Sequence, residues 1–258
     1  MTRALSRRVL PFVLADVLLL GSCGGTGGDP PRGELGGVED QGEFSEDVTA
    51  TTNDSRPDDW FVDQALEVGL DFVHFNGTAG DFLYPEILPP GVGLFDYDND
   101  GDLDVFIVQG RMLRADQTSS EALMPPKFSR PGARLYRNDL NHEGDGQPVL
   151  GFTDVTEQSE IVADGYGLGV ATGDFDNDGW VDLYVTNFGP GQLLRNLGGE
   201  TFTDVSRGAG IENHREFGVS AAFVDYDRDG WLDLYVANNV DYDLEDRTEC
   251  PNMAGSRD

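Results

Sequence analysis

Short apolar runs alternate with acidic turns through most of this chain. Residues 91–95 precede one such turn, and residues 103–108, 181–185 and 232–236 each follow one. These runs are rich in Val, Leu, Phe and Tyr, which are favoured in β-strands, and they are too short for typical helices. The pattern therefore predicts β-hairpins in which each acidic turn joins two strands.

Two further markers recur around the hairpins. An L-x-R-N segment lies at residues 135–138 and again at 193–196, and an F-T-D-V segment lies at 152–155 and again at 202–205. A strand, an acidic turn, a strand and these two marker strands make a unit of about 50 residues, which is the size of a propeller blade. The predicted fold is all-β and built from β-propeller blades.

The repeats are expected to occupy residues 57–258 and to form an incomplete, open arc. Only three acidic turns occur, whereas a closed propeller needs at least about four blades. The 258-residue chain is therefore expected to be a piece of a longer protein. The first unit carries two insertions, one near residues 71–90 and one near 111–134 that continues in 141–148, and both are candidate binding loops. Alternation around His74 places that residue on a predicted strand.

The acidic turns share the pattern D-x-D-x-D-G-x-x-D, with Gly always at the sixth position. Alternate carboxylates on a tight turn converge on one point and repel one another unless a cation lies there. Ca²⁺ suits such a site because it accepts many oxygen ligands with loose geometry. The candidate carboxylates are Asp96, Asp98, Asp100 and Asp104 in the first loop, Asp174, Asp176, Asp178 and Asp182 in the second, and Asp225, Asp227, Asp229 and Asp233 in the third.

These loops differ from an EF-hand, which needs a bidentate Glu at position 12 and flanking helices. Position 12 holds Ile107, Val185 and Val236 in turn. We therefore predict calcium turns within β-hairpins, with side-chain ligands from positions 1, 3, 5 and 9. The carbonyl of position 7, which is Asp102, Trp180 or Trp231, completes the expected ligand set. The alternative is an acidic hairpin turn that holds no metal.

The first 23 residues resemble an export signal. Arg3, Arg7 and Arg8 precede an apolar run at residues 9–20, which is too short to span a bilayer. The run ends in Leu-Gly-Ser-Cys, so Cys23 matches the lipidation site of a bacterial lipobox. The alternative is a cleaved signal with a chance cysteine. Residues 24–56 are rich in Gly, Pro, Asp and Glu, and are expected to form a disordered tether.

The charge excludes some partners. The chain has 48 acidic and 17 basic residues, with a formal net charge of −31. This balance argues against binding nucleic-acid backbones or an anionic membrane surface. The membrane is then reached only through the possible lipid anchor. Weak all-oxygen calcium sites also suit the outside of the cell, where Ca²⁺ is near millimolar. The expected location is the bacterial cell envelope, or the medium if the protein is secreted.

Residues 91–104, together with 135–138 and 152–155, resemble the FG-GAP/VCBS repeat proteins. More narrowly, the chain resembles the bacterial members of the cartilage acidic protein family, which carry a C-terminal ASPIC/UnbV domain. The resemblance covers about residues 60–258 and implies an integrin-α-like propeller with Ca²⁺ in the blade loops, at the Asp residues named above. The resemblance also implies that Cys250 forms a disulfide with a cysteine beyond residue 258. Without such a partner Cys250 is a free thiol.

The leading functional hypothesis is a non-enzymatic, exported, calcium-binding module that contacts a protein or glycan. One alternative is the N-terminal part of an extracytoplasmic enzyme, such as a polysaccharide-acting one, whose active site lies elsewhere. The enzyme hypothesis predicts a cluster of His, Tyr, Arg or acidic side chains outside the calcium turns. The other alternative is a structural spacer.

Overall fold

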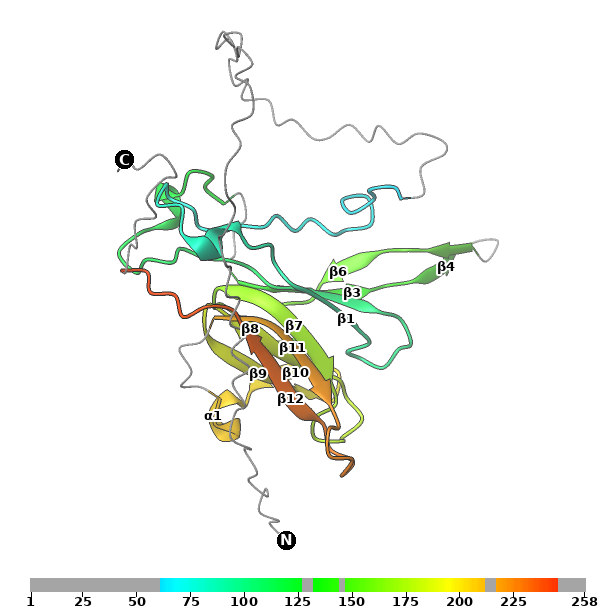
Figure 1. The fold of residues 1–258 in the computed structure, drawn as a ribbon. Coiled ribbons are helices and arrows are strands. Elements are labelled where there is room, and N and C mark those ends of the chain that lie inside the picture. Colours follow the sequence, from blue (N-terminus) through cyan, green and yellow to red (C-terminus); the bar gives the residue numbers. More distant parts are fainter. Residues whose placement is uncertain (1–60, 127–131, 144–146, 212–216, 246–258) are drawn as a thin grey trace, which may run out of the picture. The chain divides into compact units, whose positions relative to one another are not determined.

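The computed structural model describes residues 61–126, 132–143, 147–211 and 217–245, all of which belong to one unit, Asn53–Asp258. The export signal at 1–23 with Cys23, the tether at 24–56, and Cys250 lie outside these residues. The described part is nearly all β-structure (Figure 1). It contains no helix with the length and apolar character needed to cross a membrane.

The first repeat forms a four-stranded antiparallel sheet in the order β1-β2-β3-β6. The acidic loop joins β1 (Val92–Phe95) to β2 (Asp104–Ile107). The L-x-R-N marker forms β3 (Arg134–Asn138), and the F-T-D marker forms β6 (Phe152–Asp154). Sequence order therefore equals spatial order, as in a propeller blade.

The second repeat builds the same sheet, with the order β10-β9-β8-β7. Its acidic loop joins β7 (Gly167–Gly173) to β8 (Asp182–Asn187). The markers again supply the third and fourth strands, β9 (Gly189–Leu197) and β10 (Thr201–Asp204). A short helix, α1 (Ser206–Ala209), follows the last strand.

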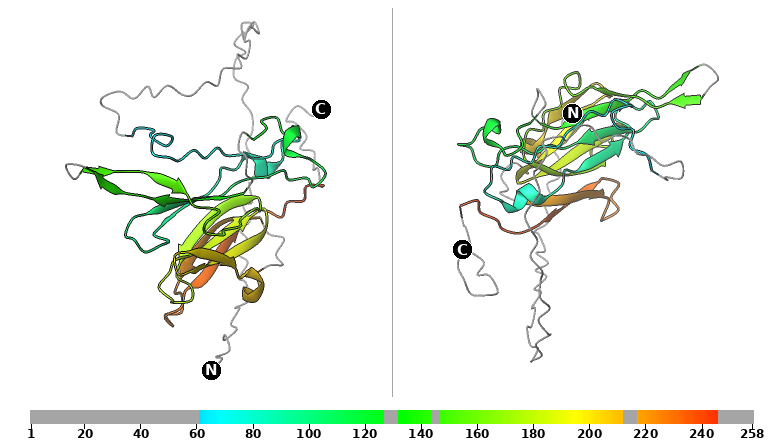
Figure 2. Two further views of the ribbon diagram at one scale, coloured as in Figure 1. Left: turned by 180° about the vertical axis from the view of Figure 1, so that it is seen from behind. Right: turned by 90° about the horizontal axis from the view of Figure 1, so that it is seen from above.

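The third repeat is described only as a hairpin, in which β11 (Gly218–Val224) pairs with β12 (Asp233–Asn238). The insertions of the first repeat hold a small hairpin, β4 (Asn141–Glu143) with β5 (Gln147–Val149), and two 3-10 turns, η1 (Tyr84–Ile87) and η2 (Ser119–Glu121). Figure 2 shows these elements from two further sides. The prediction of all-β repeats in an open arc is confirmed.

The core lies between the repeats. Phe106, Leu183 and Leu194 are almost fully buried in one apolar cluster that draws on the first two sheets. The strand β11 packs beside β7, so the third hairpin covers the second sheet in the same way. Each sheet thus depends on its neighbour for burial, as stacked repeats do.

The strand expected around His74 is absent from the structure. Gln109 explains the difference, because its side-chain amide bonds the backbone that a strand ladder would use. Its Oε1 accepts the N–H of Phe75 at 2.7 Å, and its Nε2 donates to the carbonyl of Val73 at 3.1 Å. The Gln109 side chain therefore satisfies two backbone groups of this segment, the N–H of Phe75 and the carbonyl of Val73, that a neighbouring strand would otherwise bond.

Candidate metal centre

The first carboxylate of each loop holds the turn together. Asp96 accepts the N–H groups of Asp100, at 3.1 Å, and Gly101, at 3.0 Å. Asp174 and Asp225 accept the matching pairs in the second and third loops, at 2.9 to 3.1 Å. An Asp side chain that bonds its own backbone favours a turn over a helix or sheet. The loop shape is therefore built into the sequence.

Two positions in each loop have left-handed backbone. Gly101, Gly179 and Gly230 at position 6 have φ values of 97°, 92° and 90°. Glycine adopts this region without steric cost, which explains its recurrence. Position 4 is also left-handed, at Asn99, Asn177 and Arg228. Asn tolerates this region better than most residues with a side chain.

The last carboxylate of the loop is buried in the first two repeats. Asp104 accepts the N–H of Tyr97 at 2.9 Å and that of Asn138 at 2.8 Å. Asp182 accepts the N–H of Phe175 at 3.1 Å and that of Asn196 at 2.8 Å. The asparagine of the L-x-R-N marker therefore closes the loop from the next strand.

Burial also sets the acidity of these two groups. It raises the pKa of Asp104 to about 6 and that of Asp182 to about 7, although their backbone hydrogen bonds oppose the shift. Keeping such carboxylates ionised at neutral pH costs free energy unless positive charge lies nearby.

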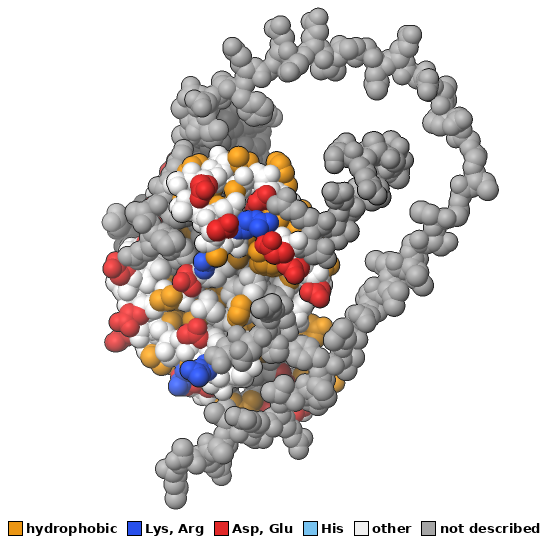
Figure 3. Space-filling model, turned by 90° about the vertical axis from the view of Figure 1, so that its left-hand side faces the viewer, with side chains coloured by type: hydrophobic (Ala, Val, Ile, Leu, Met, Phe, Trp, Pro, Cys, Tyr) orange, Lys and Arg blue, Asp and Glu red, His pale blue; other side chains and the backbone are white. Residues whose placement is uncertain are grey.

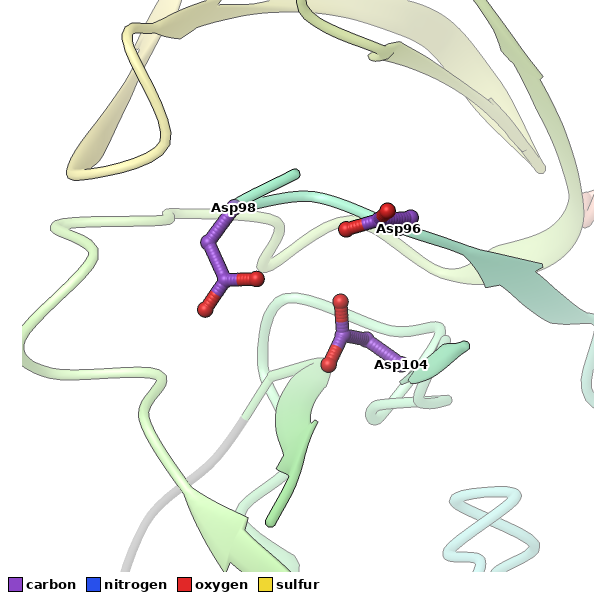
Figure 4. A group of neighbouring side chains, drawn as sticks. All are labelled: Asp96, Asp98 and Asp104. Carbon is purple, nitrogen blue, oxygen red and sulfur yellow. The ribbon is translucent and has the colours of Figure 1, made fainter. Parts of the chain in front are cut away.

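Three carboxylates converge in each loop. Asp96, Asp98 and Asp104 point toward one another in the first loop (Figure 4), with a ligand oxygen from each within 4.8 Å of the others. The second group is Asp174, Asp176 and Asp182, and the third is Asp225, Asp227 and Asp229.

The remaining candidates lie at the margin of these groups. Asp100 and Asp178 are outside the converging sets and instead accept the backbone N–H of Asp102 and Trp180, at 2.9 and 3.1 Å. In the third loop Asp229 joins the group although it also accepts the N–H of Trp231 at 2.9 Å. The carboxylate at position 5 thus holds the backbone of the position-7 residue in each loop.

Asp233 differs from its counterparts. Asp104 and Asp182 are completely buried, whereas Asp233 is exposed and lies outside the third converging set. Like Asp104 and Asp182, it accepts the backbone N–H of the second residue of its loop, here Tyr226 at 3.0 Å. The described residues give it no asparagine like Asn138 or Asn196.

The donor set fits a hard cation. Asp98 and Asp176 each hold a buried carboxylate oxygen, Oδ1, with no hydrogen-bond partner. Burial raises the pKa of both groups. A buried carboxylate oxygen without a donor is costly, and a cation with oxygen preference would satisfy it.

A guanidinium approaches the second loop. Arg195 of the L-x-R-N marker lies 2.5 Å from Asp176 through Nε and 2.8 Å from Asp178 through a terminal nitrogen. Arg137, its counterpart, instead pairs with Asp139 at 2.7 Å. The second loop therefore has a positive side chain on its carboxylates, and the first does not have an equally direct one.

Neighbouring loops are joined by asparagine side chains. Asn99 donates to the carbonyl of Gly179 at 3.0 Å, and Asn177 donates to that of Gly230 at 2.9 Å. Asn196 adds a bond from the second repeat to the carbonyl of Tyr97, at 2.8 Å. Sequence reasoning missed these links, although the recurrence of Asn at position 4 was a visible signal.

Comparison with known proteins supports the repeat assignment. A family model described as an FG-GAP-like repeat matches residues 96–185 and 174–236, which together cover more than half of the chain. Each match spans two successive acidic loops.

Three relatives share part of the sequence. Cartilage acidic protein 1 of Mus musculus and that of Homo sapiens are each 30% identical over 91 residues, which is 35% of this chain. The Xenopus tropicalis protein of the same name is 33% identical over 73 residues, or 28% of this chain. The matched segment spans only 14% of the mouse and human proteins and 11% of the frog protein.

Proposed function

The chain belongs to the FG-GAP-like repeat family, and from this premise we propose that it is an exported, calcium-binding repeat protein that presents a surface to protein or glycan partners. The proposal has three parts: calcium in the acidic loops, export, and contact with a partner.

The observation that carries the calcium assignment is an unpartnered carboxylate oxygen in each of two loops. Asp98 and Asp176 each hold a buried Oδ1 without a hydrogen-bond partner, and each carboxylate converges with two others of its loop. In a turn without metal, a buried carboxylate oxygen that lacks a hydrogen-bond partner would only destabilise the fold. Because the same arrangement occurs in two repeats, metal binding explains it better than a local packing defect does.

The proposed ligands follow from this geometry. Side chains at positions 1, 3 and 9 would hold the ion in the first two loops, with position 5 and the carbonyl of position 7 as further donors. In the third loop, positions 1, 3 and 5 converge instead. Bound calcium supplies positive charge that neutralises the carboxylates and ties the two strands of a hairpin together. Metal binding would then contribute to folding.

The N-terminal segment supports export. Its basic start, short apolar run and Cys23 favour a lipidated envelope protein, and a calcium-dependent fold suits that compartment. Changing Cys23 to Ser in a bacterial host tests the anchor. The wild-type chain should fractionate with membranes and incorporate radiolabelled palmitate, and the variant should lose both properties. Equal labelling of the two proteins would contradict the anchor.

The partner is proposed from the surface and the repeat architecture. Acidic side chains recur across the face in Figure 3, where basic ones are few. Such a surface suits partners that are neutral or basic, and it disfavours nucleic acid. Stacked repeats also offer extended surfaces of the kind used for binding.

A thermal melt of the full chain, with millimolar calcium and with chelator, tests the central part of the proposal. Calcium at a hundred times its Kd stabilises by about 2.7 kcal/mol per site, so a rise of several degrees in Tm is expected. Asp98→Ala and Asp176→Ala should each reduce that rise. Asp164→Ala is the control, because it removes an exposed charge outside the loops.

Two results would contradict the calcium assignment. One is a cooperative melt whose Tm is the same with calcium and with chelator. The other is a calcium response that Asp164→Ala reduces as much as the loop variants do.

A further inference from the structure

The first and second acidic loops contact each other at positions next to their proposed metal ligands. The side chain of Asn99 donates to the carbonyl of Gly179 at 3.0 Å. The next residue, Trp180, packs on Gly199 together with the first loop, because a Cβ added to Gly199 would lie 2.6 Å from the indole ring and 3.0 Å from the Cα of Asp98. A residue that offers its carbonyl to the second site therefore lies close to a ligand of the first.

A buried asparagine joins the same two loops from the third strand of the second sheet. Asn196 of β9 is completely buried, and its backbone N–H donates to the carboxylate of Asp182 at 2.8 Å. Its side-chain amide donates to the carbonyl of Tyr97 at 2.8 Å. Tyr97 lies between two proposed ligands of the first loop, and its own N–H bonds a third, Asp104, at 2.9 Å. Asn196 and Tyr97 thus connect a carboxylate of the second site to one of the first.

The matching asparagine of the first repeat shows what Asn196 adds. Asn138 donates its backbone N–H to Asp104 and its side-chain amide to the carbonyl of Leu103, at 3.1 Å. Asn196 makes the corresponding side-chain bond to Val181, at 3.2 Å, and the bond to the other loop in addition. Among the described residues Asn138 bonds no other acidic loop. The two side chains therefore share their role within a repeat and differ in the link between repeats.

The two loops should also influence each other when metal binds. Converging carboxylates repel one another in an empty loop, so ordering that loop opposes the first binding event. An ion in one loop fixes the groups that it shares with the other, and the second ion then has less disorder to remove, which gives positive cooperativity. Direct electrostatics acts in the opposite direction, because the first ion neutralises charge that attracts the second. Positive coupling would therefore have to pass through the contacts between the loops.

We propose that the first and second calcium sites fill cooperatively, and that Asn196 is the positioning residue that couples them. The proposal rests on the calcium binding proposed above and adds how these sites respond to calcium concentration. Filling either site raises the affinity of the other by about fivefold, and the effect is reciprocal. The first two repeats then become ordered over a narrower range of calcium concentration than two independent sites would allow.

Isothermal titration of the full chain with calcium tests the coupling. All proteins carry Asp227→Asn, which weakens the third site. Adding Asp176→Asn gives the affinity of the first site alone, and adding Asp98→Asn gives that of the second site alone. The coupling factor is the product of the two affinities in the protein with both sites, divided by the product of the two single-site affinities. A factor of about five or more is expected.

Alanine variants locate the coupling. Asn196→Ala keeps the backbone bond to Asp182 but removes the amide between the loops, so the coupling factor should fall about fivefold. The Asp→Asn changes lower the local charge equally in both series, and their effect cancels in this comparison. Asn138→Ala is the matched control, because it deletes the equivalent buried amide without a link between loops, and it should leave the factor unchanged. Asn99→Gly cuts the other link at an exposed position, so it tests the coupling even where Asn196→Ala does not fold.

Amide hydrogen exchange gives a readout that a purely structural role would not change. In the Asp98→Asn protein, calcium can fill the second loop but not the first. It should nevertheless slow exchange at the N–H groups of Asp100 and Gly101 in the first loop. Asn196→Ala should abolish this protection and leave that of Gly179, in the second loop, in place.

Several results would overturn the proposal. One is a coupling factor of one or less in the protein with both sites. Another is a factor that folded Asn196→Ala and Asn99→Gly leave unchanged, or that Asn138→Ala lowers equally. Calcium that binds both sites independently would refute the coupling and leave the calcium assignment intact, whereas no calcium binding in any of these proteins would overturn both.

Discussion

The side-chain amide of Asn99 donates a hydrogen bond to the carbonyl of Gly179, so the first acidic loop is tied directly to the second. Asn177 repeats the bond to Gly230 of the third loop. The loops therefore stabilise one another as well as their own hairpins.

Replacing Asn99 by Gly should lower the free energy of unfolding by about 0.5 to 1.5 kcal/mol, the usual net contribution of a hydrogen bond. Gly keeps the left-handed backbone, so the change isolates the lost bond from strain. Chemical denaturation in calcium measures it. Arg228→Gly is the control, because Arg228 has the same backbone conformation, φ 61°, and bonds no neighbouring loop among the described residues. An equal loss in both variants would mean that the bond between loops contributes nothing.

Changing Asp98 and Asp104 to Asn should separate a metal ligand from a structural acceptor. Both oxygens of Asp104 accept backbone N–H groups, so an Asn amide would oppose one of these donors and cost about 1–3 kcal/mol, with or without calcium. Asp98 has an oxygen without a partner. Asp98→Asn should therefore leave the melt in chelator unchanged or slightly raised, while it reduces the calcium-induced shift. Loss of stability in chelator from Asp98→Asn would contradict this assignment.

Arg195 should compete with calcium at the second loop. Removing its charge with Arg195→Gln frees Asp176 and Asp178, at a cost of up to about 1 kcal/mol in the metal-free protein, as for other partly exposed ion pairs. Calcium affinity should rise by up to about fivefold at this site. Isothermal titration with calcium measures the change. Arg137→Gln is the matched variant, and it should alter affinity less because Arg137 pairs with Asp139.

The calcium response should grow with pH. Burial raises the pKa of Asp104 to about 6 and that of Asp182 to about 7, above the ordinary value near 4 in an unfolded chain. The metal-free folded protein then binds more protons than the unfolded chain, so its stability falls as pH rises through this range. Bound calcium offsets the charge.

The measurement is the difference between Tm in calcium and Tm in chelator, taken at about pH 5.5 and about pH 7.5. A larger difference at the higher pH is expected. His74, whose pKa is lowered by burial, contributes to both melts and cancels in the difference. A difference that is constant across this range would show that the buried carboxylates are not neutralised by the metal.

The hairpins and their order could be predicted because apolar strands and acidic turns repeat locally along the chain. The markers at Leu135 and Leu193 located the third strand of each sheet correctly. The roles of Asn138 and Asn196 were not predicted, since a buried asparagine that caps a distant Asp depends on contacts between strands. The segment around His74 was misassigned because alternation cannot show that Gln109, far along the chain, replaces the strand ladder.

Each loop brings together three of the carboxylates that its sequence pattern offers, and the sequence does not show which three. The pattern predicts position 5 as an equal ligand, whereas Asp100 and Asp178 lie outside the converging sets and accept backbone N–H groups, and Asp229 lies inside its set. Spacing shows which carboxylates share a turn, but the direction of each side chain depends on the backbone bonds that it accepts. Asp233 illustrates the same limit, because its exposure depends on a neighbouring strand.

The bonds between loops also give the row of repeats a direction. Asn99 and Asn177 at position 4 each donate to the following loop, and the Gly179 and Gly230 carbonyls at position 6 each accept from the preceding one. Arg228 occupies the donor position of the third loop with a different side chain. A repeat placed upstream of Asn99, with its own asparagine at position 4, would meet the Gly101 carbonyl at the position that accepts in the next two loops, so the row can be extended on its acceptor side without a change in the first loop.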